Sequence, residues 1–191
     1  MSKGRLEAFS DGVIAILITI MVLELKVPHG ADFAALSGLT PVFLSYVLSF
    51  VFLGIYWNNH HHLLQVAKHV NGSVLWANLH LLFWLSLIPF VTGWMGENDF
   101  AELPVALYGA VIWMSGFAYY ILTHTLVSLH GNDSLLATAL GRKIKEITSL
   151  VCYTVAIIFA FISTGISLAI YVFVAGMWLV PDKRIEKTLG R

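Results

Sequence analysis

The stretch MSKGRLEAFSDGVIAILITIMVLEL, residues 1–25, places an arginine and two carboxylates at the root of an almost unbroken apolar run. The charged residues are Arg5, Glu7 and Asp11, and the apolar run begins at about Phe9. A charged side chain in an apolar setting costs free energy unless it is paired or hydrated. These residues are therefore a topology signal, a structural clamp or part of an ion path.

The composition of the whole chain is that of an integral membrane protein. Of its 191 residues, 58% are hydrophobic and 12% are charged, and the mean hydropathy is +0.81. Soluble globular domains carry about 25% charged residues. The first apolar run contains Asp11 and lacks a small-residue cleavage site, so we expect no cleavable signal peptide. The single Cys152 excludes a disulfide within one chain, and no basic block is large enough to predict nucleic-acid binding.

The apolar segments predict six transmembrane helices, because each crossing needs about 20 predominantly apolar residues. The first four are expected at about residues 9–25, 40–57, 74–95 and 103–129. The remaining run, residues 147–180, has 34 residues and no charge. A single helix of that length would greatly exceed a hydrocarbon core of about 30 Å. Ser163, Thr164 and Gly165 near its middle are typical of a break between two short crossings.

The basic residues predict the orientation of these helices. With six crossings and a cytoplasmic N-terminus, ten basic residues lie inside and Lys26 alone lies outside. The inside group consists of Lys3, Arg5, Lys68, Arg142, Lys143, Lys145, Lys183, Arg184, Lys187 and Arg191. Five crossings would place the basic C-terminal tail outside, against the positive-inside rule. We therefore expect a single all-α transmembrane domain over residues 1–191, with both termini cytoplasmic.

One face of the first helix is a stripe of mainly branched apolar side chains. At about 100° per residue, Ile16, Ile20 and Leu23 fall within about 60° of arc, with Thr19 at the edge. The serine and aspartate near the start of the helix project to other sides. Periodicity alone leaves lipid-facing, core and pore-lining positions open for this stripe, because apolar stripes are ordinary in membrane helices.

The first span begins with the pattern R-x-x-x-F-S-D, which is made by Arg5, Phe9, Ser10 and Asp11. This pattern resembles the signature of the transmembrane protein 175 family. Two further stretches are similar to the same family, namely YWNNHH at residues 56–61, and Asn78 with SLIPF at residues 86–90. Animal members of this family are endolysosomal potassium channels, and bacterial members are smaller single-repeat proteins. The resemblance covers essentially the whole chain, which has the size of a bacterial member.

The resemblance implies a homotetramer in which four first helices line a central pore. In the family, bulky apolar residues of this helix form the constriction, beginning five residues after the motif aspartate. The corresponding ion-path residues of this chain are Ile16, Thr19, Ile20 and Leu23. The family lacks the TVGYG-type carbonyl filter, and this sequence contains no such motif. The implied function is a potassium-permeable channel with passive flux, a hydrophobic gate and modest selectivity over sodium.

The resemblance also suggests that the motif ties the first three helices together. An unpaired carboxylate at this depth is costly, so we expect Ser10 and Asp11 to contact the histidines at residues 60–62 and Asn78. Consecutive histidines point to different sides of a helix, and no metal-binding spacing is present, so no structural metal site is expected. The predicted clamp consists of Arg5, Phe9, Ser10, Asp11, His60, His61 and Asn78.

Other classes of function remain open at this point. A secondary transporter usually shows internal repeats with broken helices, and a proton-permeable leak pathway is a further alternative. An intramembrane enzyme would need a nucleophile–base pair or a metal constellation, which the sequence does not offer, so we expect no enzyme. No cofactor is expected besides permeant K⁺ ions. The expected partners are copies of the same chain, membrane lipids and monovalent cations, and the expected location is the bacterial inner membrane.

Overall fold

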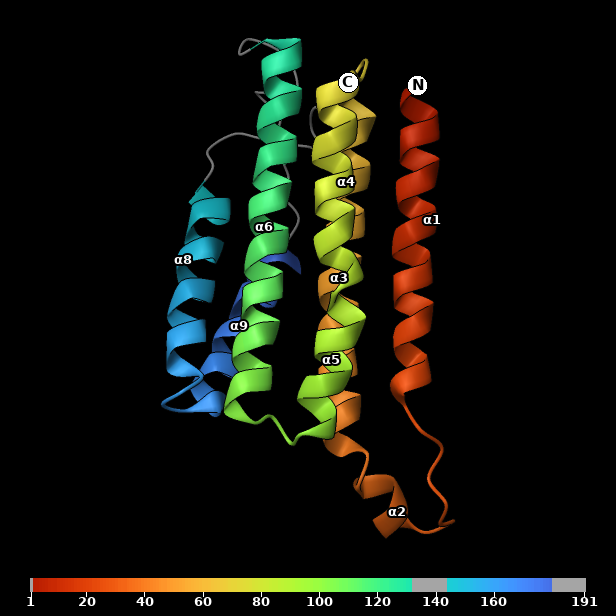
Figure 1. Cartoon of the computed structure of the whole chain (residues 1–191), viewed down its shortest axis with the longest axis vertical. Coiled ribbons are helices and arrows are strands. Elements are labelled where there is room, and N and C mark those ends of the chain that lie inside the picture. The colour runs from red at the N-terminus through yellow and green to blue at the C-terminus, as the bar shows by residue number, and fades with distance from the viewer. Residues whose placement is uncertain (1, 132–143, 180–191) are drawn as a thin grey trace.

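The chain forms a bundle of helices that follow the long axis of the molecule (Figure 1). The computed structural model describes residues 2–131 and 144–179, and these residues contain no strand. The longer helices are α1 (Lys3–Met21), α3 (Thr40–Val66), α4 (Gly72–Ser86), α5 (Ile88–Glu97) and α6 (Glu102–His130). Two 16-residue helices follow, α8 (Ile144–Phe159) and α9 (Thr164–Leu179). The short elements η1 (Val22–Glu24) and α2 (Phe33–Ser37) connect α1 to α3.

Within residues 2–131 and 144–179, four segments are long and apolar enough to cross a membrane, and they match the first four predicted spans. They are Lys3–Glu24, Thr40–Val66, Gly72–Glu97 and Glu102–His130. The apolar helix α9 is shorter, because 16 residues extend only about 24 Å along a helix axis. The all-helical, membrane-spanning architecture is therefore confirmed, whereas the number of six crossings stays a prediction.

The third predicted span consists of two helices in the structure. α4 ends at Ser86 and α5 begins at Ile88, although the apolar run of residues 74–95 predicted one continuous span. The cause is Pro89, which has no N–H group and whose ring disturbs the preceding turn of a helix. The N–H of Leu87 donates instead to the carbonyl of Trp84 at 3.2 Å, a tight closing turn.

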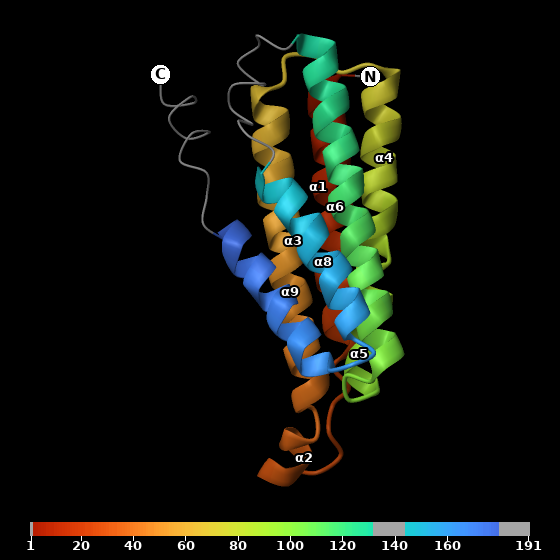
Figure 2. The same ribbon diagram turned by 90° about the vertical axis from the view of Figure 1, so that its left-hand side faces the viewer.

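The predicted break in the last apolar run is present. α8 ends at Phe159 and α9 begins at Thr164, and Figure 2 shows the two helices as a hairpin beside α6 and α3. The hydroxyl of Ser167 donates to the carbonyl of Ala156 at 2.7 Å and so ties the two arms together. This bond satisfies the hydrogen-bonding capacity of the serine hydroxyl in its apolar surroundings and also stabilises the hairpin.

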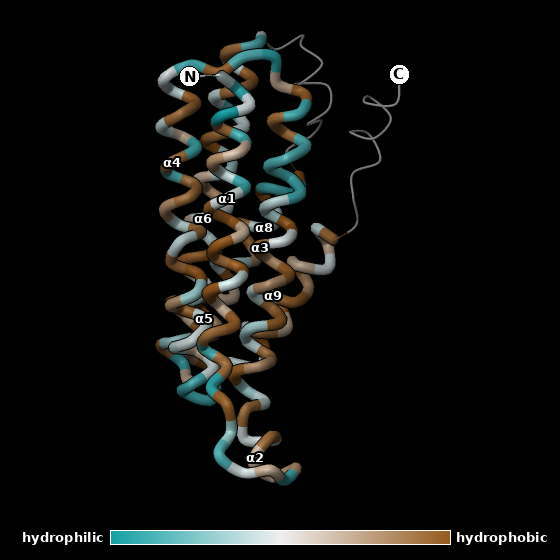
Figure 3. Tube along the Cα trace, turned by 90° about the vertical axis from the view of Figure 1, so that its right-hand side faces the viewer, coloured by the Kyte–Doolittle hydropathy of each residue, from teal (hydrophilic) through white to brown (hydrophobic). Residues whose placement is uncertain are grey.

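Polar residues collect at the two ends of the bundle, and apolar residues occupy the length between them (Figure 3). One end holds Lys3 and Lys68, which contact the end of α3 and His130 respectively. The opposite end holds Lys26, which is paired with Glu97. Lys26 is thus separated from the basic residues near the start of α1, as the orientation argument requires. Six residues of that argument lie outside the described part of the chain, namely Arg142, Lys143, Lys183, Arg184, Lys187 and Arg191.

Helix α6 lies inside the bundle, where it packs against α4, α5, α8 and α9. At Gly109, α6 lies so near α9 that a Cβ atom would overlap the hydroxyl group of Tyr171. That hydroxyl donates to the carbonyl of Val105 at 3.1 Å, one turn earlier on α6. Glycine at this position therefore allows the tyrosine to reach the backbone of the neighbouring helix.

Candidate functional site

The predicted ion-path residues of α1 and η1 all face away from the core of their own chain. Ile16 is 57% exposed, Ile20 is 42% exposed and Leu23 is 76% exposed, and Thr19 is also exposed. The opposite face of the helix is buried and consists of Leu6, Ser10, Ile14, Leu17 and Met21. The stripe is thus not core, which leaves lipid and a pore as its two possible environments.

The hydroxyl group of Thr19 donates to the carbonyl of Ile16 at 2.9 Å. A hydroxyl has one donor hydrogen and two acceptor lone pairs, so this bond uses the hydrogen. The oxygen lone pairs of Thr19 remain available on the exposed face of α1. This arrangement suits contact with a cation better than contact with an anion.

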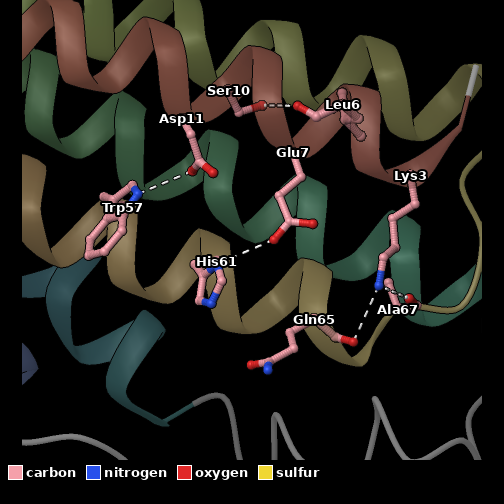
Figure 4. A network of polar contacts seen from close by, with 9 residues as sticks. All are labelled: Lys3, Leu6, Glu7, Ser10, Asp11, Trp57, His61, Gln65 and Ala67. Carbon is pink, nitrogen blue, oxygen red and sulfur yellow. Dashed lines mark hydrogen bonds and ion pairs between the residues drawn. The ribbon is translucent and has the colours of Figure 1, made fainter.

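A ladder of polar contacts joins the first three turns of α1 to the last turns of α3 (Figure 4). The Nε1 atom of Trp57 donates to Asp11 Oδ1 at 3.1 Å. One turn nearer the N-terminus, His61 Nδ1 lies 3.2 Å from Glu7 Oε1. The helices run in opposite directions, so each step of four residues towards the start of α1 is matched by four residues towards the end of α3.

The last rung of this ladder is a helix cap. The ammonium group of Lys3 donates to the carbonyl of Ala67 at 3.0 Å and to that of Gln65 at 3.4 Å. The final carbonyls of a helix have no partner within the helix, and a positive charge there also suits the helix dipole. Lys3 therefore holds the start of α1 against the end of α3.

A second chain of contacts lies deeper and links α1, α4 and α3. Ser10 is fully buried and its hydroxyl donates to the carbonyl of Leu6 at 2.9 Å. The same oxygen accepts a bond of 2.9 Å from Asn78 Nδ2, and Asn78 Oδ1 lies 2.7 Å from His60 Nε2. Asn78 and His60 are both fully buried. This chain contains no charged carboxylate, which suits its apolar surroundings.

The directions of these hydrogen bonds determine which ring nitrogen of His60 carries a hydrogen. The hydrogen of Ser10 is used by the backbone, so Ser10 must accept from the amide nitrogen of Asn78. The amide oxygen of Asn78 then faces His60 and can only accept, so His60 carries a hydrogen on Nε2. The Nδ1 atom of His60 is buried and has no partner among the residues that the structure describes.

The structure brings together only part of the predicted clamp. Ser10, His60 and Asn78 form one connected network, but Asp11 contacts Trp57 instead of the histidines or Asn78. Consecutive residues of a helix point about 100° apart, so Ser10 and Asp11 face different neighbours.

The other two motif residues lie at the surface of the single chain. Phe9 is 51% exposed, on the same side of α1 as Ile16. Arg5 is also exposed, and its side chain has no hydrogen-bond or ion-pair partner within the described residues. Neither residue therefore contributes to holding α1 within its own chain.

Trp57 and Glu7 are contact residues that the predicted clamp did not include. The signal was present in the spacing: Lys3, Glu7 and Asp11 recur every four residues, and so do Trp57 and His61. Residues four apart share one face of a helix, so two such series on antiparallel helices can pair rung by rung. The sequence alone did not show which two helices would face each other.

Opposite this end of the bundle, Lys26 forms an ion pair with Glu97, which ties the loop after η1 to the end of α5. The hydrogen bond and charge of Glu97 raise the pKa of the Lys26 amine above its ordinary value. The carboxylate of Glu24 packs beside Gly93, where an added Cβ atom would lie 3.2 Å from its Oε2 atom. Among residues 2–131 and 144–179, no three metal-ligating side chains lie together.

Comparison with known proteins gives consistent matches along the chain. A family model described as the endosomal/lysosomal potassium channel TMEM175 matches residues 5–89. A potassium channel of Chryseobacterium sp. (strain P1-3) is 56% identical over 189 residues, which cover 99% of this chain and 98% of that protein. The human endosomal/lysosomal proton channel TMEM175 is 32% identical over 182 residues, which cover 86% of this chain and 36% of the human protein.

A solved structure also resembles this fold. It is described as the crystal structure of a lysosomal potassium-selective channel TMEM175 homologue from Chamaesiphon minutus. The TM-score is 0.80 at 26% sequence identity, and the match covers 93% of this chain and 96% of that one.

Proposed function

This chain belongs to the TMEM175 family and is a multi-pass membrane protein, and on that premise we propose that it forms a potassium-permeable cation channel. Two bacterial relatives, from Chryseobacterium and Chamaesiphon, are named potassium channels, which supports the choice of ion. The family consists of ion channels, and accordingly we propose no enzymatic activity and no resident cofactor. Potassium is the permeant ion, and the cell membrane, a bacterial inner membrane, is the proposed location.

The observation that carries the proposal is the exposed stripe on α1. The stripe is one face of one helix, and one helix face cannot enclose a pore. Several copies of the chain must therefore assemble around the pore axis. We propose a homotetramer in which Ile16, Ile20 and Leu23 of four chains surround the axis, with Thr19 beside them. The burial of the opposite face of α1 by this chain's own helices supports the arrangement, because it leaves this stripe free for the pore.

A ring of four isoleucine side chains would gate by excluding water. Hydrophobic constrictions close by dewetting. An ion passes when the ring is wide enough for the ion to keep part of its hydration shell. The free lone pairs of Thr19 supply oxygen contacts one turn from the ring. We propose passive potassium flux with modest preference over sodium, because an apolar ring favours the ion that loses its water more easily.

The polar ladder and the buried network have a separate role in this proposal. They hold α1 at a fixed height and rotation against α3 and α4, so the stripe faces the axis. Six crossings with cytoplasmic termini remain our proposed topology, supported by the separation of Lys26 from Lys3 and Arg5 along the bundle. Asp11 acts as a positioning residue in this scheme and does not bind the ion.

A second candidate function is proton permeation. The human relative is named a proton channel, which favours this alternative over a secondary transporter. A liposome flux assay separates the possibilities. Purified protein in liposomes loaded with potassium should carry a passive potassium flux, a smaller sodium flux and no flux of the impermeant cation N-methylglucamine. Proton uptake without potassium flux would overturn the proposal in favour of the proton pathway, and obligatory counter-ion exchange would indicate a transporter.

A further inference from the structure

A cavity lies within the bundle between α3, α6, α8 and α9, away from the stripe on α1. It contains about 450 Å³ of empty space, including its open mouth. Its walls are mainly aromatic, formed by Phe52, Tyr56, Tyr119, Tyr153 and Trp178. Among the described lining residues, Glu146 supplies the one carboxylate.

Most of the hydrogen-bond donors that line the cavity are used within the protein, and the hydroxyl of Tyr153 is the exception among the described side chains. The hydroxyl of Tyr119 donates to the carbonyl of Asn59 at 3.3 Å, and the amide of Asn59 donates to the carbonyl of Ile55 at 2.8 Å. The indole N–H of Trp178 donates to Ser149 Oγ at 2.8 Å, and that hydroxyl donates to the backbone at 2.7 Å. An anionic ligand would need donors that these groups already use. The aromatic faces and the carboxylate favour a cation instead.

The ring of Trp178 already has one positively charged neighbour. The ammonium group of Lys145 lies 6.0 Å from the centre of the Trp178 ring. Aromatic faces attract cations through the charge distribution of the ring, and quaternary or alkylated ammonium ions are bound in this way by aromatic cages. A carboxylate in a partly enclosed site adds a charge interaction that is stronger than in water.

The space itself depends on Gly116. A Cβ atom at this position would lie 3.5 Å from Leu150 Cδ2, 3.7 Å from the Tyr56 hydroxyl and 3.9 Å from Tyr153 Cε2. These are ordinary contact distances, so alanine fits without strain but narrows the cavity. The missing side chain thus leaves room that a small ligand can fill.

We propose that this cavity binds a small organic cation of the alkylammonium class, held between the aromatic faces and the carboxylate of Glu146. The site is separate from the proposed pore. It shares α3 with the ladder, since Tyr56 and Asn59 flank Trp57 on that helix. A bound cation would therefore brace α8 and α9 against the helix that positions α1.

The test uses two probes of nearly equal shape, tert-butylammonium and its neutral counterpart tert-butanol. Each is titrated calorimetrically into the purified full-length protein in detergent, at a fixed potassium chloride concentration. We expect the cation to bind with a millimolar dissociation constant and the alcohol about tenfold more weakly, because only the cation gains the charge terms. Equal affinity for both probes would overturn the proposal and indicate a plain apolar cavity.

Two variants locate the binding. Glu146→Gln should weaken tert-butylammonium about tenfold, and Gly116→Ala should weaken it several-fold with potassium flux unchanged. Gly176→Ala is the matched control for the second variant, because a Cβ there meets open space. If Glu146→Gln does not fold, Gly116→Ala decides. Affinity unchanged in Gly116→Ala, or affinity lost in Ile16→Asn, would place the cation elsewhere, the latter in the pore, and overturn the proposal.

Discussion

The indole N–H of Trp57 donates a 3.1 Å hydrogen bond to Asp11, one turn along each helix from the contact between His61 and Glu7. The two contacts fix both the height and the rotation of α1 against α3. A single contact would leave the helix free to turn about it, whereas two contacts on one face prevent this. The motif aspartate is thus tied to the second long helix of its own chain.

Trp57→Phe keeps the ring and removes the donor of this bond. We expect a loss of about 1 kcal/mol in the stability of the assembled protein, because the contact is partly exposed, with nearly unchanged ion preference. Thermal unfolding and reversal potentials on one preparation measure both. Trp76→Phe is the control, since Trp76 is 76% exposed and makes no described hydrogen bond.

Asp11→Ala separates a positioning role from ion binding. Loss of the Asp11 carboxylate should reduce the yield of assembled protein, while the channels that do form keep their cation preference. Size-exclusion profiles and reversal potentials distinguish the two roles. A stable assembly with abolished cation preference would move Asp11 into the ion path and contradict our assignment.

Asn78→Ala removes the centre of the buried network. It strands the hydrogen-bonding groups of Ser10 and His60, at a cost of about 1–3 kcal/mol for each. We expect a loss of stability that exceeds that of Trp57→Phe, measured by thermal unfolding in detergent. Asn98→Ala, at an exposed helix end, should have little effect. Similar losses for the two asparagines would argue against a structural role of the network.

Ile16→Asn should widen and wet the narrowest point of the proposed pore. The expected result is a higher single-channel conductance and a weaker preference for potassium over sodium, because a polar ring no longer excludes water. Ile16→Val, which stays apolar, should retain the preference. Unchanged currents and selectivity in Ile16→Asn, at equal surface density, would exclude this residue from the constriction.

Gly109→Ala should destabilise the contact between α6 and α9 by about 1–3 kcal/mol, because the added methyl group overlaps the Tyr171 hydroxyl. Tyr171→Phe removes that hydroxyl and should restore part of the loss in the double variant. Thermal unfolding of the two single variants and the double variant gives the coupling. Additive losses would show that the overlap is not the cause.

The pair of Lys26 and Glu97 predicts a dependence on alkaline pH. The raised pKa of Lys26 means that the ion pair stabilises the folded chain below the ordinary lysine pKa of about 10.4. This contribution is lost as the pH rises through the folded-state pKa. The melting temperatures of the wild type and Glu97→Gln should therefore differ at pH 8 and converge at pH values well above 10.4. A constant difference would assign the effect to another contact.

Much of the architecture could be predicted because it depends on local composition. The length of each apolar run, the glycine near residue 165 and the spacing of Ile16, Ile20 and Leu23 are properties of neighbouring residues. Membrane thickness and helix geometry convert them directly into spans, a break and a stripe. Pro89 was equally visible, but the length of its apolar run favoured one continuous helix.

The order of the amino acids is enough to identify a helical membrane protein, to locate its first four spans and to show which side chains share a face of α1. Which helix faces meet depends on the three-dimensional packing. Asp11 pairs with Trp57, and Ser10 with Asn78, because α1 packs against α3 and α4 in one particular rotation. Glycine is required at position 109 because the side chain of Tyr171, from a helix distant in sequence, packs against its backbone. Such contacts depend on the packing of whole helices, which no short stretch of sequence contains.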